Sequence, residues 1–183
     1  MTATQPHTPP TLSARQALHA RVWALLEPLT DPEIPVITLR ELGILREVRD
    51  SADGRDLQVI ITPTYSGCPA MGQIEDDVKA ALTAHGIAAQ VITQLSPVWT
   101  TDWMVPAAKE KLRAYGIAPP HACEAQASSV VQFAARTPHA MSVACPQCGS
   151  VNTTETSHFG STACKAMYKC LDCLEPFDYF KPY

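Results

Sequence analysis

Cys145-Pro146-Gln147-Cys148 and Cys170-Leu171-Asp172-Cys173 are two C-x-x-C pairs separated by 21 residues. Each pair can present two thiolates from one tight turn, and two facing turns complete a tetrahedral site for zinc. Residues 141–183 are too few to bury a sufficient core alone, so a metal that binds only the folded state would supply the missing stability. The spacing therefore predicts a zinc-ribbon-like module with a structural zinc; an iron–sulfur cluster on the same four cysteines is the alternative.

A fifth cysteine of this module, Cys164, lies outside both pairs and has Lys165 beside it, which would favour its thiolate. It is a candidate additional thiolate that exchanges with a ligand or helps to hold a cluster; the alternative is a small buried hydrophobic residue. Residues 141–183 contain three Lys and four Asp or Glu, a net charge of −1. This module lacks the basic surface that nucleic-acid binding requires.

The segment before this module changes character. Residues 117–140 contain seven Ala, three Pro and only two charged residues, without a sustained period, which indicates a linker. Cys123 lies in this segment, and the sequence assigns it no role. Residues 1–12 hold three of the sixteen Pro and predict a disordered leader.

Residues 13–116 alternate between helical and strand patterns. Ser13 and Gln16 have the form of a capping box that opens a helix, and Asp53-Gly54 is a hairpin signal between two strands. The prediction is an α+β fold: a small sandwich-like N-terminal domain with a three-stranded sheet, followed by the zinc-ribbon-like module. Its elements are helices over about 13–30, 69–86 and 106–116, and strands over 44–48, 57–62 and 89–95.

Thr62-Pro63-Thr64-Tyr65-Ser66-Gly67-Cys68-Pro69 joins a predicted strand to a predicted helix. If Pro69 is the first helical residue, Cys68 takes the capping position, where free N–H groups and the helix dipole lower the pKa of a thiol. A nucleophilic or metal-binding thiolate is one interpretation, and an ordinary core cysteine is the other. Asp31 and Glu33, in a stiff turn with two prolines, are candidate acid/base groups or metal ligands, or else part of a solvated turn.

Composition narrows the function further. The chain has 183 residues, 46% of them hydrophobic, and a formal charge of −4, which gives no general attraction to nucleic acid or anionic lipid. Its apolar runs fall far below the roughly 20 residues that span a bilayer, and Met1 to Pro10 carries no secretory signal. We therefore expect a cytoplasmic protein with no membrane partner, whose seven cysteines serve metal binding or thiol chemistry.

Several motifs together resemble the PaaD (also called PaaJ) family of the bacterial phenylacetyl-CoA 1,2-epoxidase system. The N-terminal part also resembles the broader superfamily of iron–sulfur cluster assembly domains, whose members share an Asp-Pro-Glu turn and a Cys-Pro step. The motifs are Asp31-Pro32-Glu33-Ile34-Pro35, Leu42-Gly43-Ile44, the stretch from Thr62 to Pro69, Trp99-Thr100-Thr101-Asp102-Trp103-Met104, Phe159-Gly160-Ser161-Thr162-Ala163-Cys164-Lys165 and Glu175-Pro176-Phe177-Asp178-Tyr179-Phe180.

This resemblance implies an accessory protein of aerobic phenylacetate catabolism, not a catalyst. It would help to mature or load the metal centres of an iron–sulfur flavin reductase or a di-iron oxygenase, and these subunits would be its protein partners. A transient iron–sulfur cluster or iron would be its cargo. By this resemblance, the residues that bind the transferred cluster would be Asp31, Glu33 and Cys68. The ligands of the metal in the ribbon would be Cys145, Cys148, Cys170 and Cys173.

One departure from the family is visible at the end of the sequence. Members can end with a cysteine shortly after the Phe-Lys step, whereas here Lys181 is followed by Pro182 and Tyr183. Two other functions remain open. The chain could be a non-catalytic structural subunit of the oxygenase complex, or an independent thiol-dependent enzyme, for which no partner base is apparent in the sequence.

Overall fold

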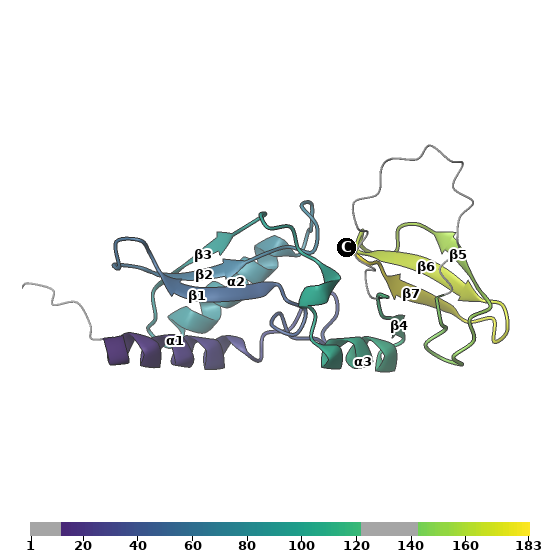
Figure 1. The fold of residues 1–183 in the computed structure, drawn as a ribbon, viewed down its shortest axis with the longest axis horizontal. Helices are drawn as coiled ribbons and strands as arrows, with labels where there is room; N and C mark the ends of the chain where they lie inside the picture. The colour runs from purple at the N-terminus through teal and green to yellow at the C-terminus, as the bar shows by residue number, and fades with distance from the viewer. Residues whose placement is uncertain (1–11, 122–142) are drawn as a thin grey trace, which may run out of the picture.

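The computed structural model describes residues 12–121 and 143–183, so most of the predicted leader and linker, with Cys123, lies outside the described residues (Figure 1). The elements confirm the predicted α+β class. In chain order they are α1 (Leu12–Leu26), β1 (Leu45–Asp50), β2 (Leu57–Ile61), α2 (Met71–Thr83), β3 (Ala89–Thr93), the 3₁₀ turn η1 (Thr101–Trp103), α3 (Pro106–Ala114), β4 (Ile117–Ala118), β5 (Thr153–Ser157), β6 (Lys165–Cys170) and β7 (Pro176–Phe180).

The N-terminal part is a three-stranded sheet in the order β1-β2-β3. As predicted, β1 and β2 form an antiparallel hairpin, and β2 then pairs in parallel with β3 after the α2 crossover. Helices α1 and α2 pack against each other and against this sheet. Their apolar faces bury Val22 and Leu26 from α1, and Ile74, Val78 and Leu82 from α2. Full burial of each such side chain contributes about 1.5–3 kcal/mol.

The predicted bounds of α1 are wrong at both ends. The helix already includes Leu12, so Ser13 lies inside it and does not cap it. It stops at Leu26 and not near Thr30. Pro28 explains the early end, because its ring lacks an N–H and collides with the carbonyl four residues earlier.

The second sheet has the order β4-β7-β6-β5. Its β5-β6 and β6-β7 pairs are antiparallel, as expected for a ribbon. The short strand β4 adds to it in parallel, with Ile117 opposite Asp178 and Ala118 opposite Tyr179. The structure therefore differs from the predicted linker at its start, because residues 117 and 118 belong to this sheet.

Adjacent residues of β4 serve two different cores, since successive side chains of a strand point to opposite faces. Ile117 belongs to the core of the N-terminal part, whereas Ala118 packs in the core of the second sheet. Residues 143–183, here called the ribbon, contribute Cys164 and Phe180 to the N-terminal core as well. The two parts thus share packed side chains.

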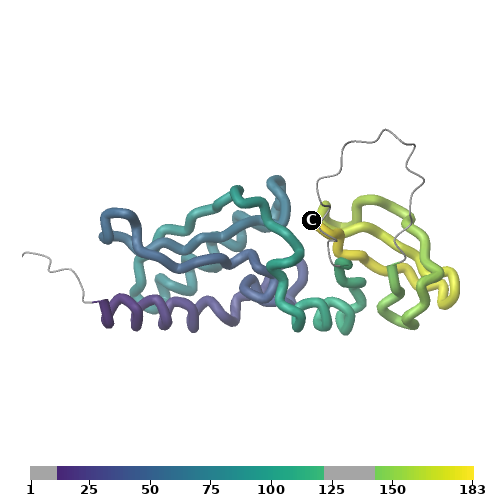
Figure 2. Tube along the Cα trace, in the orientation of Figure 1, coloured from purple at the N-terminus to yellow at the C-terminus, as the bar shows by residue number. Residues whose placement is uncertain are grey.

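Trp99 lies at the contact between the two parts. It is 1% exposed, and its Nε1 donates a hydrogen bond of 3.1 Å to the carbonyl oxygen of Leu42. Its ring centroid is 6.1 Å from that of Phe180 and 6.2 Å from that of Tyr183. Figure 2 shows the C-terminus between the two halves of the molecule. Within the residues described, none of the helices has the length and apolar character to cross a membrane.

Candidate metal sites

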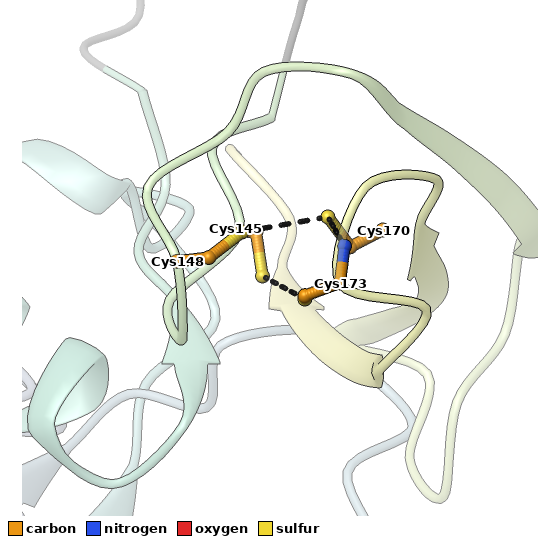
Figure 3. A group of neighbouring side chains, drawn as sticks. All are labelled: Cys145, Cys148, Cys170 and Cys173. Atoms are coloured by element: carbon orange, nitrogen blue, oxygen red, sulfur yellow. Dashed lines mark hydrogen bonds between the residues drawn. The ribbon is translucent and has the colours of Figure 1, made fainter.

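The four cysteines of the C-x-x-C pairs meet at one end of the ribbon (Figure 3). Their sulfur atoms all lie within 4.8 Å of one another. The Sγ atoms of Cys145 and Cys173 are 3.7 Å apart, and those of Cys148 and Cys170 are 3.6 Å apart. A tetrahedral zinc site with Zn–S bonds of about 2.3 Å requires sulfur atoms about 3.8 Å apart. The donor set therefore fits a closed four-thiolate metal site.

Backbone geometry shapes both cysteine turns. In the first turn the N–H of Gly149 donates to the carbonyl oxygen of Cys145 at 2.9 Å, with Gly149 at a φ of +76°. In the second turn the N–H of Cys173 donates to the Sγ of Cys170 at 3.5 Å. This N–H lowers the pKa of the Cys170 thiol to about 7, which favours the thiolate that a metal needs.

Asp172 ties the two cysteine turns together. Its carboxylate accepts hydrogen bonds from the Ser150 hydroxyl and from the Asn152 amide, the latter at 2.7 Å. These two hydrogen bonds lower the pKa of Asp172, so its carboxylate is ionised at neutral pH. Asp172 thereby orients the ligand turns without itself being a ligand, as outer-shell groups do in metal sites.

Cys68 lies in a turn that precedes α2. Its N–H donates to the carbonyl oxygen of Tyr65 at 3.2 Å, and its own carbonyl oxygen accepts from Met71 at 3.4 Å. Because α2 begins at Met71 with Ala70 as its cap, the predicted capping role of Cys68 is wrong. The side chain is half-buried and packs against the N-terminal core.

The expected low pKa of Cys68 is wrong as well. Burial raises the pKa of this thiol, the N–H of Ala70 opposes that rise, and the negative charges of Asp31, Cys164 and Glu33 add to it. The thiol is therefore protonated at neutral pH in the metal-free protein.

Asp31 is buried, at 7% exposure, so the solvated-turn interpretation is wrong for this residue. Its Oδ1 accepts hydrogen bonds of 2.9 Å from the N–H groups of Glu33 and Ile34. Burial raises the pKa of Asp31, while these N–H groups and the charge of Lys165 oppose the rise. Glu33, the second predicted acid, lies in the same turn and is half-exposed.

Cys164 is buried at the boundary between the ribbon and the N-terminal part, at 7% exposure. Its Sγ lies 3.0 Å from the hydroxyl oxygen of Thr162. Burial is the main reason that the pKa of this thiol is raised; the charge of Lys165 lowers the pKa, as expected, but does not outweigh burial, so the predicted activated thiolate is wrong. Lys165 instead forms an ion pair of 3.0 Å with Asp178.

Sequence reasoning missed that Cys164 of the ribbon is buried in the core of the N-terminal part. It assigned Cys68 to one domain and Cys164 to another, 96 positions apart, and no local pattern reports that both belong to this core. It also missed Tyr65 and Tyr183, whose hydroxyls both contact the backbone of Ala163 beside Cys164. The family motifs did contain both cysteines, and their joint occurrence was the available signal.

Comparison with known proteins accounts for both parts of the chain. Residues 19–95 match a family model described as "Iron-sulfur cluster assembly protein", and residues 131–181 match the "PaaD zinc beta ribbon domain". The chain is 48% identical over 163 residues to a putative 1,2-phenylacetyl-CoA epoxidase subunit of Escherichia coli (strain K12), covering 87% of this chain and 90% of that protein. The chain belongs to the PaaD family of phenylacetyl-CoA epoxidase subunits.

Within this PaaD-family chain, the match to the assembly model contains Asp31, Glu33 and Cys68, and the ribbon match contains Cys164 and all four clustered cysteines. A crystal structure of a DUF59 domain of unknown function from Bacillus anthracis is similar to the N-terminal part. It has 28% sequence identity and a TM-score of 0.50, and the match covers 56% of this chain and 97% of that one. The predicted resemblance and fold class are confirmed.

Proposed function

We propose that this PaaD-family chain is a non-catalytic maturation factor that loads iron or an iron–sulfur cluster into the metal centres of a phenylacetyl-CoA epoxidase system. The receiving partners are its iron–sulfur reductase or its di-iron oxygenase, in the cytoplasm. The observation that carries the proposal is the position of Cys68, Asp31 and Glu33 within a domain that matches iron–sulfur cluster assembly proteins.

The chemistry of the two thiol sites supports a division of roles. The four ribbon cysteines form a closed set, which suits a resident structural zinc that stabilises the fold. Cys68 is half-buried and lies outside that set, so a metal bound to it keeps open coordination positions. Open positions are needed for a ligand exchange that passes a metal to a partner.

The test is the metal content of the partners. A strain that lacks the chain is complemented with the wild type, with Cys68→Ser, or with Ser66→Ala, a change at an exposed residue of the same turn. The reductase and the oxygenase are then purified, and their iron and sulfide are measured. We expect Cys68→Ser to leave one of the two under-metallated, and Ser66→Ala to match the wild type. Full metal content with Cys68→Ser would refute the proposal.

A second function is favoured by the exposed apolar residues of the ribbon. Leu171 and Leu174 lie in and beside the second cysteine turn and are 48% and 62% exposed. Such side chains suit a permanent contact, as in a structural subunit of the oxygenase complex. Co-purification in fixed stoichiometry, combined with a harmless Cys68→Ser change, would support this function over maturation.

A further inference from the structure

We propose that Arg46 and Trp103 form a docking site for a carboxylate side chain of a partner protein. The guanidinium of Arg46 lies over the Trp103 ring, with its Cζ atom 3.4 Å from the ring centroid. This inference rests on the proposed function only for the choice of partner, the reductase or the oxygenase of the epoxidase system. It goes beyond that function because it assigns the contact to two residues that are not candidate metal ligands.

A β-bulge turns Arg46 outward. In the β1-β2 pair Leu45 and Glu47 lie opposite adjacent residues of β2, so Arg46 between them is an extra residue without a partner. A regular strand alternates buried and exposed residues, whereas Arg46 and its neighbour Glu47 are both exposed. Bulges re-aim single side chains in this way, and they are frequent next to functional sites. The backbone of β1 therefore directs this guanidinium to the surface.

Trp103 is held against the turn that precedes β1. A Cβ at Gly43 would lie 2.8 Å from the Cβ of Trp103 and 2.9 Å from its carbonyl oxygen, so this close approach requires glycine. Two residues after Trp103, the N–H of Val105 donates to the carbonyl oxygen of Glu41 at 3.0 Å. The Trp103 side chain also packs against the N-terminal core. The support beneath Arg46 is thus fixed before a partner binds, which reduces the entropy cost of binding.

Arg46 differs from the other stacked cations of the described residues because its guanidinium has no acceptor. Arg40 and Lys181 also lie over aromatic rings, 4.8 and 4.5 Å from the ring centroids. Arg40, however, forms an ion pair with Glu27, and Lys181 donates a hydrogen bond to a backbone carbonyl oxygen. Within residues 12–121 and 143–183, none of the five N–H donors of the Arg46 guanidinium is used. Burial also lowers the pKa of Arg46, so the group has lost part of its hydration without a replacement.

A protein carboxylate is the acceptor that fits this site. An arginine binds a carboxylate through two parallel N–H···O bonds, and a guanidinium stacked on an aromatic ring is already oriented for them. A phosphate carries up to two negative charges, which the net charge of −4 repels more strongly than it repels one carboxylate. Arginine and tryptophan also carry much of the binding energy at protein interfaces. The partner is therefore a protein that presents an Asp or Glu side chain to Arg46.

The first test is the affinity of the full, zinc-loaded chain for the purified reductase and for the purified oxygenase, measured by calorimetry. We expect the wild type to bind at least one of them and Arg46→Ala to weaken this binding roughly 10- to 100-fold. Arg46→Lys should weaken it less, because lysine keeps the charge but lacks the planar fork. Arg40→Ala is the matched control: it removes an arginine stacked on a tryptophan that is already paired with Glu27, and should bind like the wild type.

The second test identifies the group that Arg46 binds. A carbodiimide couples an amine to a carboxylate, so the amine introduced by Arg46→Lys should form an amide bond with an Asp or Glu of the partner. Peptide mapping then identifies both residues, and Arg40→Lys is the control that should give no cross-link from the introduced amine. A weakened complex without a cross-link from position 46, or a cross-link to a second copy of this chain, would overturn the assignment to a partner carboxylate.

These outcomes are separable from those of the proposed function. Unchanged affinity of Arg46→Ala, an equal loss with Arg40→Ala, or no binding of the wild type to either protein would overturn this inference. Cys68→Ser should bind as tightly as the wild type, because it changes a candidate metal ligand and not the docking site. Full metal content of the partners with Cys68→Ser would therefore refute maturation and leave the docking site standing.

Discussion

Gly149 and Leu174 occupy the same place in the two cysteine turns, one residue after the second cysteine, and both have positive φ angles, of 76° and 66°. Glycine adopts this left-handed conformation freely, whereas a residue with a Cβ loses about 1–2 kcal/mol there. Leu174 is 62% exposed, so little packing compensates the strain. The second cysteine turn therefore holds a conformation that its sequence does not favour.

Leu174→Gly should stabilise the metal-loaded protein by about 0.5–1 kcal/mol, because the relief of strain exceeds the greater chain entropy of glycine in the unfolded state. Gly149→Ala should destabilise it by about 1 kcal/mol for the converse reason. Denaturant unfolding of the zinc-loaded chain measures both changes. Leu171→Gly, in the same turn but without a positive φ, is the control and should destabilise the protein.

Trp99→Phe should cost about 1–3 kcal/mol of unfolding free energy, because it removes the donor to the buried carbonyl oxygen of Leu42. It should also loosen the ribbon, since the Trp99 ring packs against Phe180 and Tyr183. Amide exchange should therefore accelerate in β7 before it does in β2. Equal acceleration in both strands would show that Trp99 does not couple the two parts.

The ion pair of Glu41 and Lys111 should make stability depend on acid pH. Burial alone would raise the pKa of Glu41, but hydrogen bonds from Lys111 at 2.7 and 2.8 Å and from the N–H of Thr38 lower it below its ordinary value of 4.5. Because the folded-state pKa is the lower one, this stabilisation is complete above about pH 5 and is lost as the pH falls through the folded-state pKa.

Glu41→Gln should reduce the loss of unfolding free energy at acid pH by about 0.5–1 kcal/mol, the range for a partly exposed ion pair. Unfolding free energies of the variant and the wild type, measured from pH 6 to pH 3, give the difference. Glu110→Gln, on the same helix as Lys111, is the control, since Glu110 is an exposed partner of Arg113. A wild-type curve that coincides with the Glu41→Gln curve would contradict the assignment.

Removal of the ribbon metal with a chelator should unfold β5 and β6 while β1, β2 and β3 remain protected. The metal joins the two cysteine turns, whereas the N-terminal core is filled mainly by its own helices and strands. Hydrogen exchange with and without the chelator measures this directly. Simultaneous loss of protection in both sheets would mean that the shared core makes them one cooperative unit.

Local signals were sufficient for much of the fold. Asp53-Gly54 predicted the β1-β2 hairpin, where Gly54 has a φ of +67°. Pro106 and Gly116 predicted both ends of α3, because proline suits a first turn and glycine suits the left-handed position that follows a helix. The paired cysteines predicted the four-cysteine cluster of the ribbon, because each C-x-x-C pair is also a local signal, contained within four residues.

Long-range features could not be predicted in this way. A two-residue strand such as β4 has no periodicity, and its pairing with β7 depends on residues about 60 positions later. The capping role of Cys68 failed because Pro69 fits a tight turn as well as a first helical position. The burial of Cys164 follows from the packing of the ribbon against the N-terminal core, which no local pattern encodes.

The position of β4 changes what residues 122–142 connect in the fold. Ala118 before it and Val143 after it pack in the same core, so the chain leaves the second sheet and returns to it. The short passage from α3 carries β4 into this sheet, where it pairs with β7, so β4 attaches the ribbon to the N-terminal part by non-covalent contacts as well. A protease cut within residues 122–142 should therefore not release the ribbon, and an affinity tag inserted there should leave both thiol sites in place.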